Sequence, residues 1–256
     1  YHLEAYGETT VNYNRDVEIF PVLRAMFMEI YGDCPYKSPT DMGVNMAGNC
    51  IFDDEAVSDA SRREIVRRYY QAMCDLRTGR GEESAVAKIE LLMNKAEITV
   101  DINPTVAASL RKAEETGMPA VAIELPDGQV ITGKTSSLLG ASSAALLNAL
   151  KVLAGLDDSL HLIAPEVIEP IQHLKVSHLG NHNPRLHTDE TLIALSISAV
   201  TDPNAERAME HLAELSGCDA HSTVILSQVD TDVFRKLGVN MSCEPRYQTK
   251  KLYHKR

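Results

Sequence analysis

Apolar residues recur at helical spacing through most of the first hundred positions. One such face runs from residue 17 to 31 and ends at Gly32, a frequent helix terminator. A longer helix is expected through residues 57–76, and a third over residues 83–95. The segment 37–49 between the first two is too rich in Pro, Gly and Asn to be regular. The pattern predicts a helical subdomain over residues 1–100.

Beyond Asn103, short apolar runs alternate with helical patterns. Strands are expected at 120–125, 129–132, 160–163, 223–226 and 239–243, and helices at 104–115, 141–153, 167–174, 192–200, 205–215 and 231–237. Pro126-Asp127-Gly128 is a tight-turn signal that makes the first two strands a hairpin. Alternation of this kind predicts a layered α/β domain over residues 101–256, with the boundary near 96–103.

The order hairpin, helix, strand, helix resembles the cytidine-deaminase-like topology. That chemistry needs a zinc ion held by a His or Cys and a P-C-x-x-C pair, with a glutamate moving the proton. No P-C-x-x-C occurs in this chain, and the H-x-E match at His2-Leu3-Glu4 is far from the hairpin. The fold class is therefore α/β (α+β overall), with a deaminase-like order of elements that lacks the zinc motif.

The composition of the chain argues against two classes of binding partner, membranes and nucleic acids. The chain has 256 residues, 44% of them hydrophobic and 24% charged, which are globular values. It has no run of about eighteen apolar residues, so we expect no membrane contact. A net charge of −11 opposes binding to nucleic acid, which requires a basic face.

The two ends and the cysteines add three expectations. The start at Tyr1 lacks both an initiator Met and a signal sequence, so we expect a fragment or a processed product. The basic segment 244–256 suits a solvated tail, a phosphate contact or a contact with a neighbouring subunit. The five cysteines form no C-x-x-C, which indicates reduced thiols and a cytoplasmic location.

Residues 128–135 match the phosphate-loop pattern G-x-x-x-x-G-K-[ST] letter for letter. A phosphate loop needs small, flexible residues between its glycines, whereas Val130, Ile131 and Thr132 are β-branched. A hairpin explains every residue, so we interpret the match as accidental. The following segment, with Lys134 and Ser142, leads into a helix start that favours anions, although ordinary serine capping with small residues explains it slightly better.

The most informative segment is the polar loop 178–190. His178, His182 and His187 can hold a divalent metal if the loop brings them together. Alternatively, His182 or His187 acts as general acid or base while Asp189 fixes its tautomer. Arg185 then holds an anion, with Asn181 beside it. In a third interpretation these groups only satisfy the backbone of a buried crossing. The sequence does not identify a cofactor.

A second polar segment, residues 36–45, offers Asp41 and Asn45 as hydrogen-bonding groups, although its Ser-Pro-Thr-Asp start equally suits a helix cap. Together with the stretches 2–16, 138–143, 178–190 and 244–255, it resembles the bacterial family called domain of unknown function 1846, and we match it to the C-terminal half of that family. The resemblance implies a cytoplasmic bacterial protein, helical and then α/β, whose other half is an N-terminal α/β domain. It assigns no catalytic residues.

Two hypotheses follow. In the first, the chain helps to bind or process a small anionic metabolite, which can be phosphorylated, in a polar cleft shared with the other half. Its candidate catalytic residues are His182, His187 and Asp189, and its candidate binding residues are Arg185, Asn181, Asp41, Asn45, Lys134 and Ser142. In the second, the chain is a non-catalytic module that builds a homo-oligomer through its polar loops and basic tail.

Overall fold

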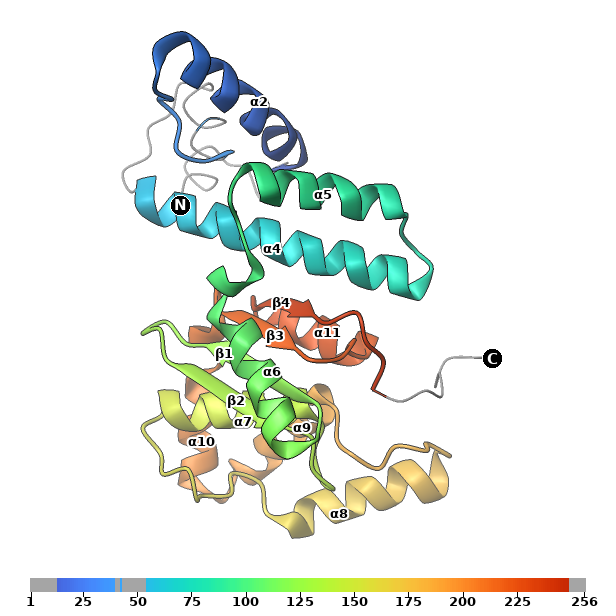
Figure 1. Ribbon diagram of the computed structural model, residues 1–256. Coiled ribbons are helices and arrows are strands. Elements are labelled where there is room, and N and C mark those ends of the chain that lie inside the picture. Colours follow the sequence, from blue (N-terminus) through green and yellow to red (C-terminus); the bar gives the residue numbers. More distant parts are fainter. Residues whose placement is uncertain (1–12, 40–41, 43–53, 249–256) are drawn as a thin grey trace. The chain divides into compact units, whose positions relative to one another are not determined.

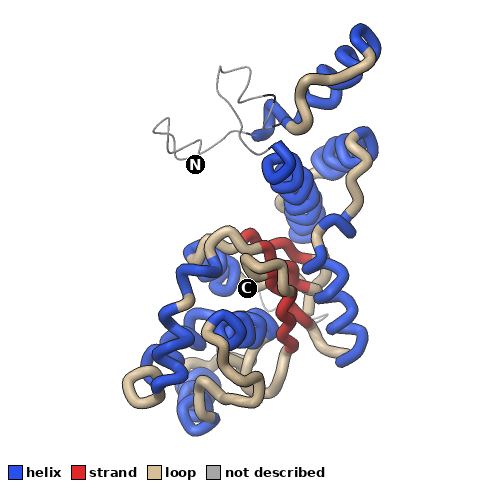
Figure 2. Tube along the Cα trace, turned by 90° about the vertical axis from the view of Figure 1, so that its left-hand side faces the viewer, coloured by secondary structure: helices blue, strands red, loops and turns tan. Residues whose placement is uncertain are grey.

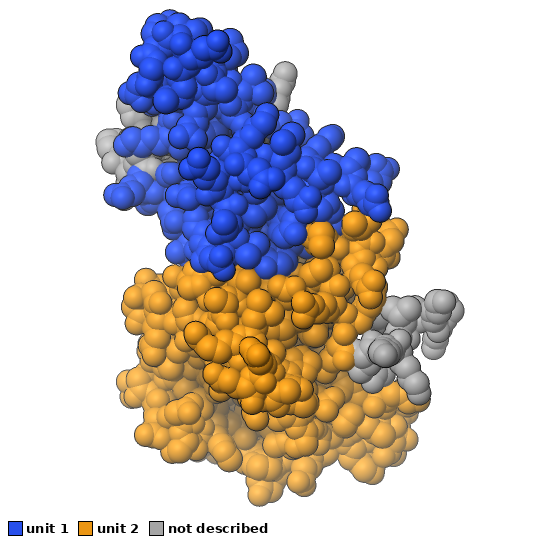
Figure 3. All heavy atoms as spheres, viewed as in Figure 1, with its two compact units in different colours: residues 1–72, 82–102 blue, residues 73–81, 103–256 orange. Residues whose placement is uncertain are grey.

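A computed structural model describes residues 13–39, 42 and 54–248 of the chain. The chain divides into two compact units, coloured separately in Figure 3. Unit 1 comprises residues 1–72 and 82–102, and unit 2 comprises residues 73–81 and 103–256.

Unit 1 is helical in its described part. It contains α2 (Tyr13–Tyr31), α4 (Asp54–Thr78, as far as Ala72), α5 (Glu83–Lys95) and the 3-10 turn η1 (Val100–Ile102) (Figure 1). The helix α2 ends before Gly32, whose φ of 73° lies in the left-handed region that terminates helices. The three helices predicted for this part of the chain are therefore confirmed.

Unit 2 carries the sheet and the remaining helices. Its elements are α6 (Pro104–Thr116), β1 (Ala120–Glu124), β2 (Val130–Lys134), α7 (Ala141–Leu153), α8 (Pro165–His173), the π-turn η2 (Leu174–His178), α9 (Thr188–Ser198), α10 (Pro203–Glu210), η3 (Leu212–Leu215), β3 (Asp219–Ser222), α11 (Gln228–Lys236) and β4 (Asn240–Cys243). The predicted α/β class, with helices first and a sheet afterwards, is confirmed. The predicted hairpin, helix, strand, helix order was wrong at its third element, because α7 is followed by α8, and the next strand is β3.

The described sheet has four strands in the order β2-β1-β3-β4. β1 runs antiparallel to both β2 and β3, while β3 and β4 are parallel. The strands β2, β3 and β4 therefore end at the same edge of the sheet. The loops that follow β2 and β3 lead into α7 and α11, so this edge collects helix starts, as ligand-binding edges of α/β sheets do.

Helices cover both faces of this sheet (Figures 1 and 2). Val121 and Ile123 of β1 belong to the main core with α7, and both are fully buried. Ala120 and Ala122 alternate with them and point to the opposite face, on which α6 packs. Small side chains on that face leave room for α6 to approach β1 closely.

Two strand predictions were wrong. Residues 160–163 form no strand, although Leu162 and Ile163 are buried in the core without strand pairing. The strand expected at 223–226 lies at 219–222 instead, where the buried His221 bonds Ser242 of β4 through its Nδ1, 2.8 Å away. Polar residues in an inner strand hid it from the hydrophobic pattern.

The hairpin interpretation of residues 128–135 is confirmed. Val130 pairs with Glu124, and Gly128 turns the chain with a φ of 84°. Cys34, Cys74, Cys218 and Cys243 are free thiols, and burial raises the pKa of Cys74 to about 12. No helix in the described part of the chain is long and apolar enough to cross a membrane.

Gly133 is the position at which α7 rests on the hairpin. A β-carbon there would lie 2.1 Å from the backbone nitrogen of Ala145, so alanine would force α7 away from β2. We expect Gly133→Ala to lower the free energy of unfolding by about 3 kcal/mol, as measured by urea denaturation. Gly140→Ala is the control: its β-carbon would meet only the Leu186 carbonyl oxygen, at 3.6 Å, and the free energy of unfolding should fall by less than about 1 kcal/mol, the cost of alanine at a helix N-cap. Equal losses in both variants would contradict this account.

Candidate functional site

A short segment, residues 185–188, meets the starts of three helices in unit 2. The Leu186 carbonyl accepts bonds from the Gly140 amide (3.2 Å) and the Ser143 hydroxyl (3.1 Å) at the start of α7. Thr188 begins α9, and its amide donates to Asp230 in the first turn of α11 (3.0 Å). Helix starts carry partial positive charge, so their convergence favours anionic groups at this edge.

A buried ion pair holds this segment in place. The Lys175 ammonium, 3% exposed, donates to the Glu190 carboxylate (2.6 Å) and to the Arg185 carbonyl (2.7 Å). The same carboxylate oxygen of Glu190 accepts the His187 amide at 2.9 Å. The Leu186 amide donates to the Leu138 carbonyl. Because its backbone groups are bonded in turn, the segment presents its side chains from a fixed frame.

Arg185 and His187 flank the buried Leu186, which is 1% exposed. Leu186 enters the core, and the backbone frame fixes the two residues predicted from the sequence on either side of it.

His187 forms an ion pair with a carboxylate that the sequence analysis missed. Its Nδ1 lies 3.0 Å from Asp230 Oδ2, and its side chain remains 31% exposed. The second oxygen of Asp230 accepts from both the amide and the hydroxyl of Thr188. The Asp230 carboxylate accepts a hydrogen bond from Nδ1–H of His187, which leaves the proton-free nitrogen of the neutral imidazole at Nε2. No described residue bonds that Nε2.

The pairing shifts the pKa values of both His187 and Asp230. The hydrogen bond to Asp230 raises the pKa of His187 above its ordinary 6.5, against the opposing effect of burial. Burial alone would raise the pKa of Asp230, but the bonds from His187, Thr188 and Ser227 outweigh it and hold that pKa below 3.8. An ionised Asp230 and a readily protonated His187 are the combination that a proton-transfer group needs.

Ser227 completes this cluster without forming a nucleophilic triad. Its hydroxyl accepts the Asp230 amide (3.1 Å) and donates to Asp230 Oδ2 (2.7 Å), which makes it the N-cap of α11. It lies 3.4 Å from Nδ1 of His187, the nitrogen already bonded to Asp230. A serine nucleophile must reach the other nitrogen of the imidazole, so Ser227 is a structural cap here.

Arg185 is held by only one of its nitrogens. Its Nε donates to the Ser136 carbonyl at 2.6 Å. Its terminal amino groups bond no other residue in the described part of the chain, and the side chain is half-buried. An anchored guanidinium with its terminal donors available is arranged to bind a carboxylate or phosphate.

The other predicted residues are placed differently. Ser142 lies in the first turn of α7, 3% exposed, and its hydroxyl bonds no described residue. Asn181 and His182 are exposed in the loop, and Lys134 is exposed at the end of β2. Asp189 accepts the amide of Glu190 at 2.8 Å, so the carboxylate that orients His187 is Asp230 and not Asp189. Asp41 and Asn45 lie outside the described residues.

Residues 178–190 do not assemble a metal site. His178 stacks against His173, with ring centroids 5.4 Å apart, while His182 and His187 lie elsewhere in the loop. Among the residues that the structure describes, no three His, Cys, Asp or Glu side chains are placed to hold a metal ion. In the basic tail, the Tyr247 hydroxyl donates to the Arg77 carbonyl at 3.5 Å, and residues 249–256 lie outside the description.

The sequence held one signal for the missed residue. Ser227-x-x-Asp230 has the spacing of a helix N-terminal capping box, which places Asp230 in the first turn of α11. The sequence contains nothing that pairs Asp230 with His187, which lies 43 positions upstream. That pairing depends on the packing of α9 against α11, and it becomes visible only in the fold.

The comparisons with known proteins identify the family. Residues 1–97 match the model described as domain of unknown function DUF1846, N-terminal, and residues 101–253 match DUF1846, C-terminal. The chain is 56% identical over its whole length to a UPF0371 protein of Streptococcus thermophilus, and 55% identical to one of Streptococcus pyogenes. It spans 52% of the length of each. The expected match to the C-terminal half alone is thus corrected, because the first 97 residues match the N-terminal model. The chain belongs to the DUF1846 family.

Proposed function

We propose that this chain binds a small anionic metabolite, phosphorylated or carboxylated, at the edge formed by the starts of α7, α9 and α11. Arg185 holds the anionic group, and His187 transfers a proton to or from the bound molecule. The observation that carries the proposal is His187 itself: its Nδ1 is fixed by Asp230, while its Nε2 bonds no described residue. This is the arrangement of a general base held in one tautomer.

Three features support an anionic ligand. The terminal donors of Arg185 are available on the side chain two positions before His187. The helix starts contribute partial positive charge to the same edge. The hydroxyl of Ser142 is buried in the first turn of α7 and can serve as a further donor. Lys134, Asn181, His182 and Asp189 belong to the proposal only as secondary contacts.

The proton-transfer step follows from the tautomer. Neutral His187 donates its Nδ1 hydrogen to Asp230 and offers the lone pair of Nε2 to an acidic hydrogen of the ligand. The resulting imidazolium is stabilised by the ionised Asp230. The same group then returns the proton as a general acid, so one residue serves both directions.

A second candidate is a homo-oligomerisation module. Ile193, Ile197 and Val200 on or just after α9 are 59%, 57% and 82% exposed, and their spacing places them along one side of the helix. An exposed apolar stripe of this kind is suited to self-contact.

Anion binding can be tested by thermal shift with inorganic phosphate and sugar phosphates. We expect millimolar ligand to raise the melting temperature of the wild-type protein by a few degrees, since ligands that bind only the native state stabilise it. Arg185→Gln should weaken binding about tenfold, because it removes a charge-assisted pair. Arg111→Gln, an exposed change on α6, is the control. Equal responses in both variants would remove the support for Arg185.

The His187–Asp230 pair makes stability depend on pH. The raised pKa of His187 adds stability that is complete below pH 6.5 and is lost as the pH rises through the folded-state pKa. The lowered pKa of Asp230 adds stability that is present above pH 3.8 and is lost as the pH falls through its folded-state pKa. We therefore expect Asp230→Asn to lower the pKa of His187 in an NMR titration. The same change should weaken the pH dependence of the free energy of unfolding on both the acid and the alkaline side.

Asp232→Asn, an exposed change on the same helix, is the matched control and should leave the His187 titration unchanged. If the pKa of His187 is 6.5 or lower in the wild-type protein, the proposed pair does not form in solution.

Sedimentation equilibrium, which measures the mass of the protein in solution, tests the oligomerisation hypothesis. If α9 forms a self-contact, Ile193→Ser with Ile197→Ser should convert the oligomer to monomer. Leu91→Ser, an equally exposed apolar change on α5, should leave the mass unchanged. A monomeric wild-type protein would rule the assembly module out and leave the anion site unaffected.

A further inference from the structure

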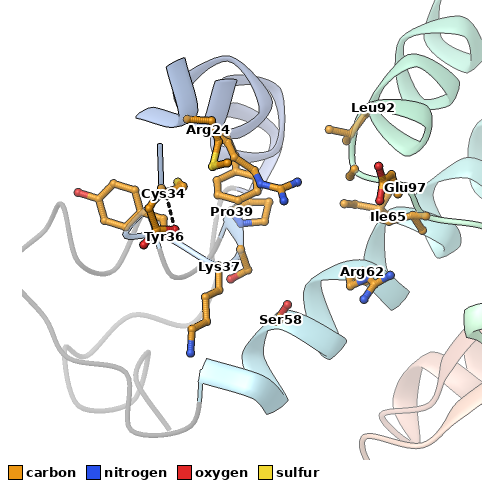
Figure 4. Close-up of a pocket in the computed structure, with 16 residues that line it drawn as sticks. Arg24, Cys34, Tyr36, Lys37, Pro39, Ser58, Arg62, Ile65, Leu92 and Glu97 are labelled. Atoms are coloured by element: carbon orange, nitrogen blue, oxygen red, sulfur yellow. Dashed lines mark hydrogen bonds between the residues drawn. The ribbon is translucent and has the colours of Figure 1, made fainter. Parts of the chain in front are cut away.

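Unit 1 contains a cavity between α2, residues 33–39, α4 and the segment around the end of α5 (Figure 4). Its volume is about 410 Å³, within the range of small-molecule sites. Every residue that lines it belongs to unit 1. The cavity is therefore independent of the His187 edge in unit 2.

Part of the cavity lining is apolar and already packed. Phe20, Ile65 and Ile98 line it and are 6%, 2% and 5% exposed, so these side chains are already packed. Tyr36 adds an aromatic side chain, held edge-on against Phe27 with ring centroids 5.8 Å apart. A preformed apolar surface with a few polar groups around it is the usual construction of a ligand pocket.

Two arginines line the cavity from different helices, Arg24 from α2 and Arg62 from α4 (Figure 4). Both are exposed, and neither forms a hydrogen bond or ion pair with any described residue. Asp33, a lining acid near them, already accepts the Cys34 amide at 2.8 Å. The cavity thus contains two guanidinium groups with available donors.

Three other arginines of α4 form ion pairs, whereas Arg62 forms none with a described residue. Arg63 bonds Asp59 at 2.8 Å, while Arg67 and Arg68 both bond Glu64, at 2.6 and 2.8 Å. These are the i,i+3 and i,i+4 pairs that an exposed helix favours. Arg62 has no such pair in the described part of α4.

Glu97 adds an acceptor to the same cavity. It has a φ of 53°, the only left-handed backbone of a non-glycine residue among those described. This conformation is unfavourable for side chains larger than Asn or Asp, so the surrounding structure imposes it. Glu97 lines the same cavity as Arg24 and Arg62, but its carboxylate bonds neither of them nor any other described residue.

We propose that this cavity binds the phosphate monoester of a small polyhydroxy compound. Its phosphate lies between Arg24 and Arg62, because two guanidinium groups match a dianion with three acceptor oxygens. Hydroxyl groups of the ligand donate to Glu97, and its carbon skeleton lies on the wall of Phe20 and Ile65. Lys37, which lines the cavity as well, adds positive charge.

The proposal can be tested by calorimetric titration of the purified protein with ribose 5-phosphate and with inorganic phosphate. We expect both ligands to bind, and Arg24→Gln and Arg62→Gln each to weaken both at least about fivefold. Glu97→Gln should weaken ribose 5-phosphate and leave inorganic phosphate unchanged or slightly tighter, since only ribose 5-phosphate has sugar hydroxyls to place against Glu97. Lys88→Gln, an exposed change on α5 outside the cavity, should alter neither affinity.

Arg185→Gln distinguishes this cavity from the edge in unit 2. Binding that survives Arg185→Gln but is weakened by Arg24→Gln supports the cavity and leaves the His187 proposal to its own test. Binding that is lost only with Arg185→Gln overturns the cavity proposal, and so does the absence of binding at about 10 mM ligand. Arg24 and Arg62 are exposed, so their variants should keep the helical circular dichroism of the wild-type protein; a variant that unfolds would contradict their assignment as ligand groups.

Discussion

The carboxylate of Asp230 is the interaction on which the edge of unit 2 depends. One oxygen accepts two bonds from Thr188 at the start of α9, and the other bonds His187 and Ser227. Two helix starts are thereby joined through a single buried charge. A charge removed from water is tolerated only when hydrogen bonds replace its hydration, and four donors do so here.

Some residues in and before the polar loop fix its backbone, while others keep nitrogens that bond no described residue. Asn183, Glu190 and Lys175 bond the backbone of Arg185 and His187. Arg185 and His187 are anchored by one nitrogen each and keep other nitrogens without a described partner. The structural and functional interpretations of the loop are therefore compatible. The frame that satisfies the backbone is what makes the two remaining groups well placed, as precise sites require.

The sequence was sufficient wherever local rules determine the structure. Periodicity and Gly32 located α2, and Pro126-Asp127-Gly128 located the hairpin, because helix ends and tight turns depend on adjacent residues. It failed at β3, whose His221 and Ser222 are stabilised by partners on neighbouring strands and not by an apolar pattern. It also named Asp189 as the partner of His187, since Asp189 is near in sequence and Asp230 is near only in space.

Both proposed anion sites contain arginines that form no ion pair with a described residue. With 36 acidic and 25 basic residues, carboxylates are abundant, and arginines such as Arg67 and Arg68 find one within a turn of helix. Arg24, Arg62 and Arg185 pair with none among the described residues. Screening limits exposed charges to a range of about 8 Å at physiological salt, so the negative net charge does not cancel these local positive groups. An anion that reaches them displaces no ion pair formed with a residue that the structure describes.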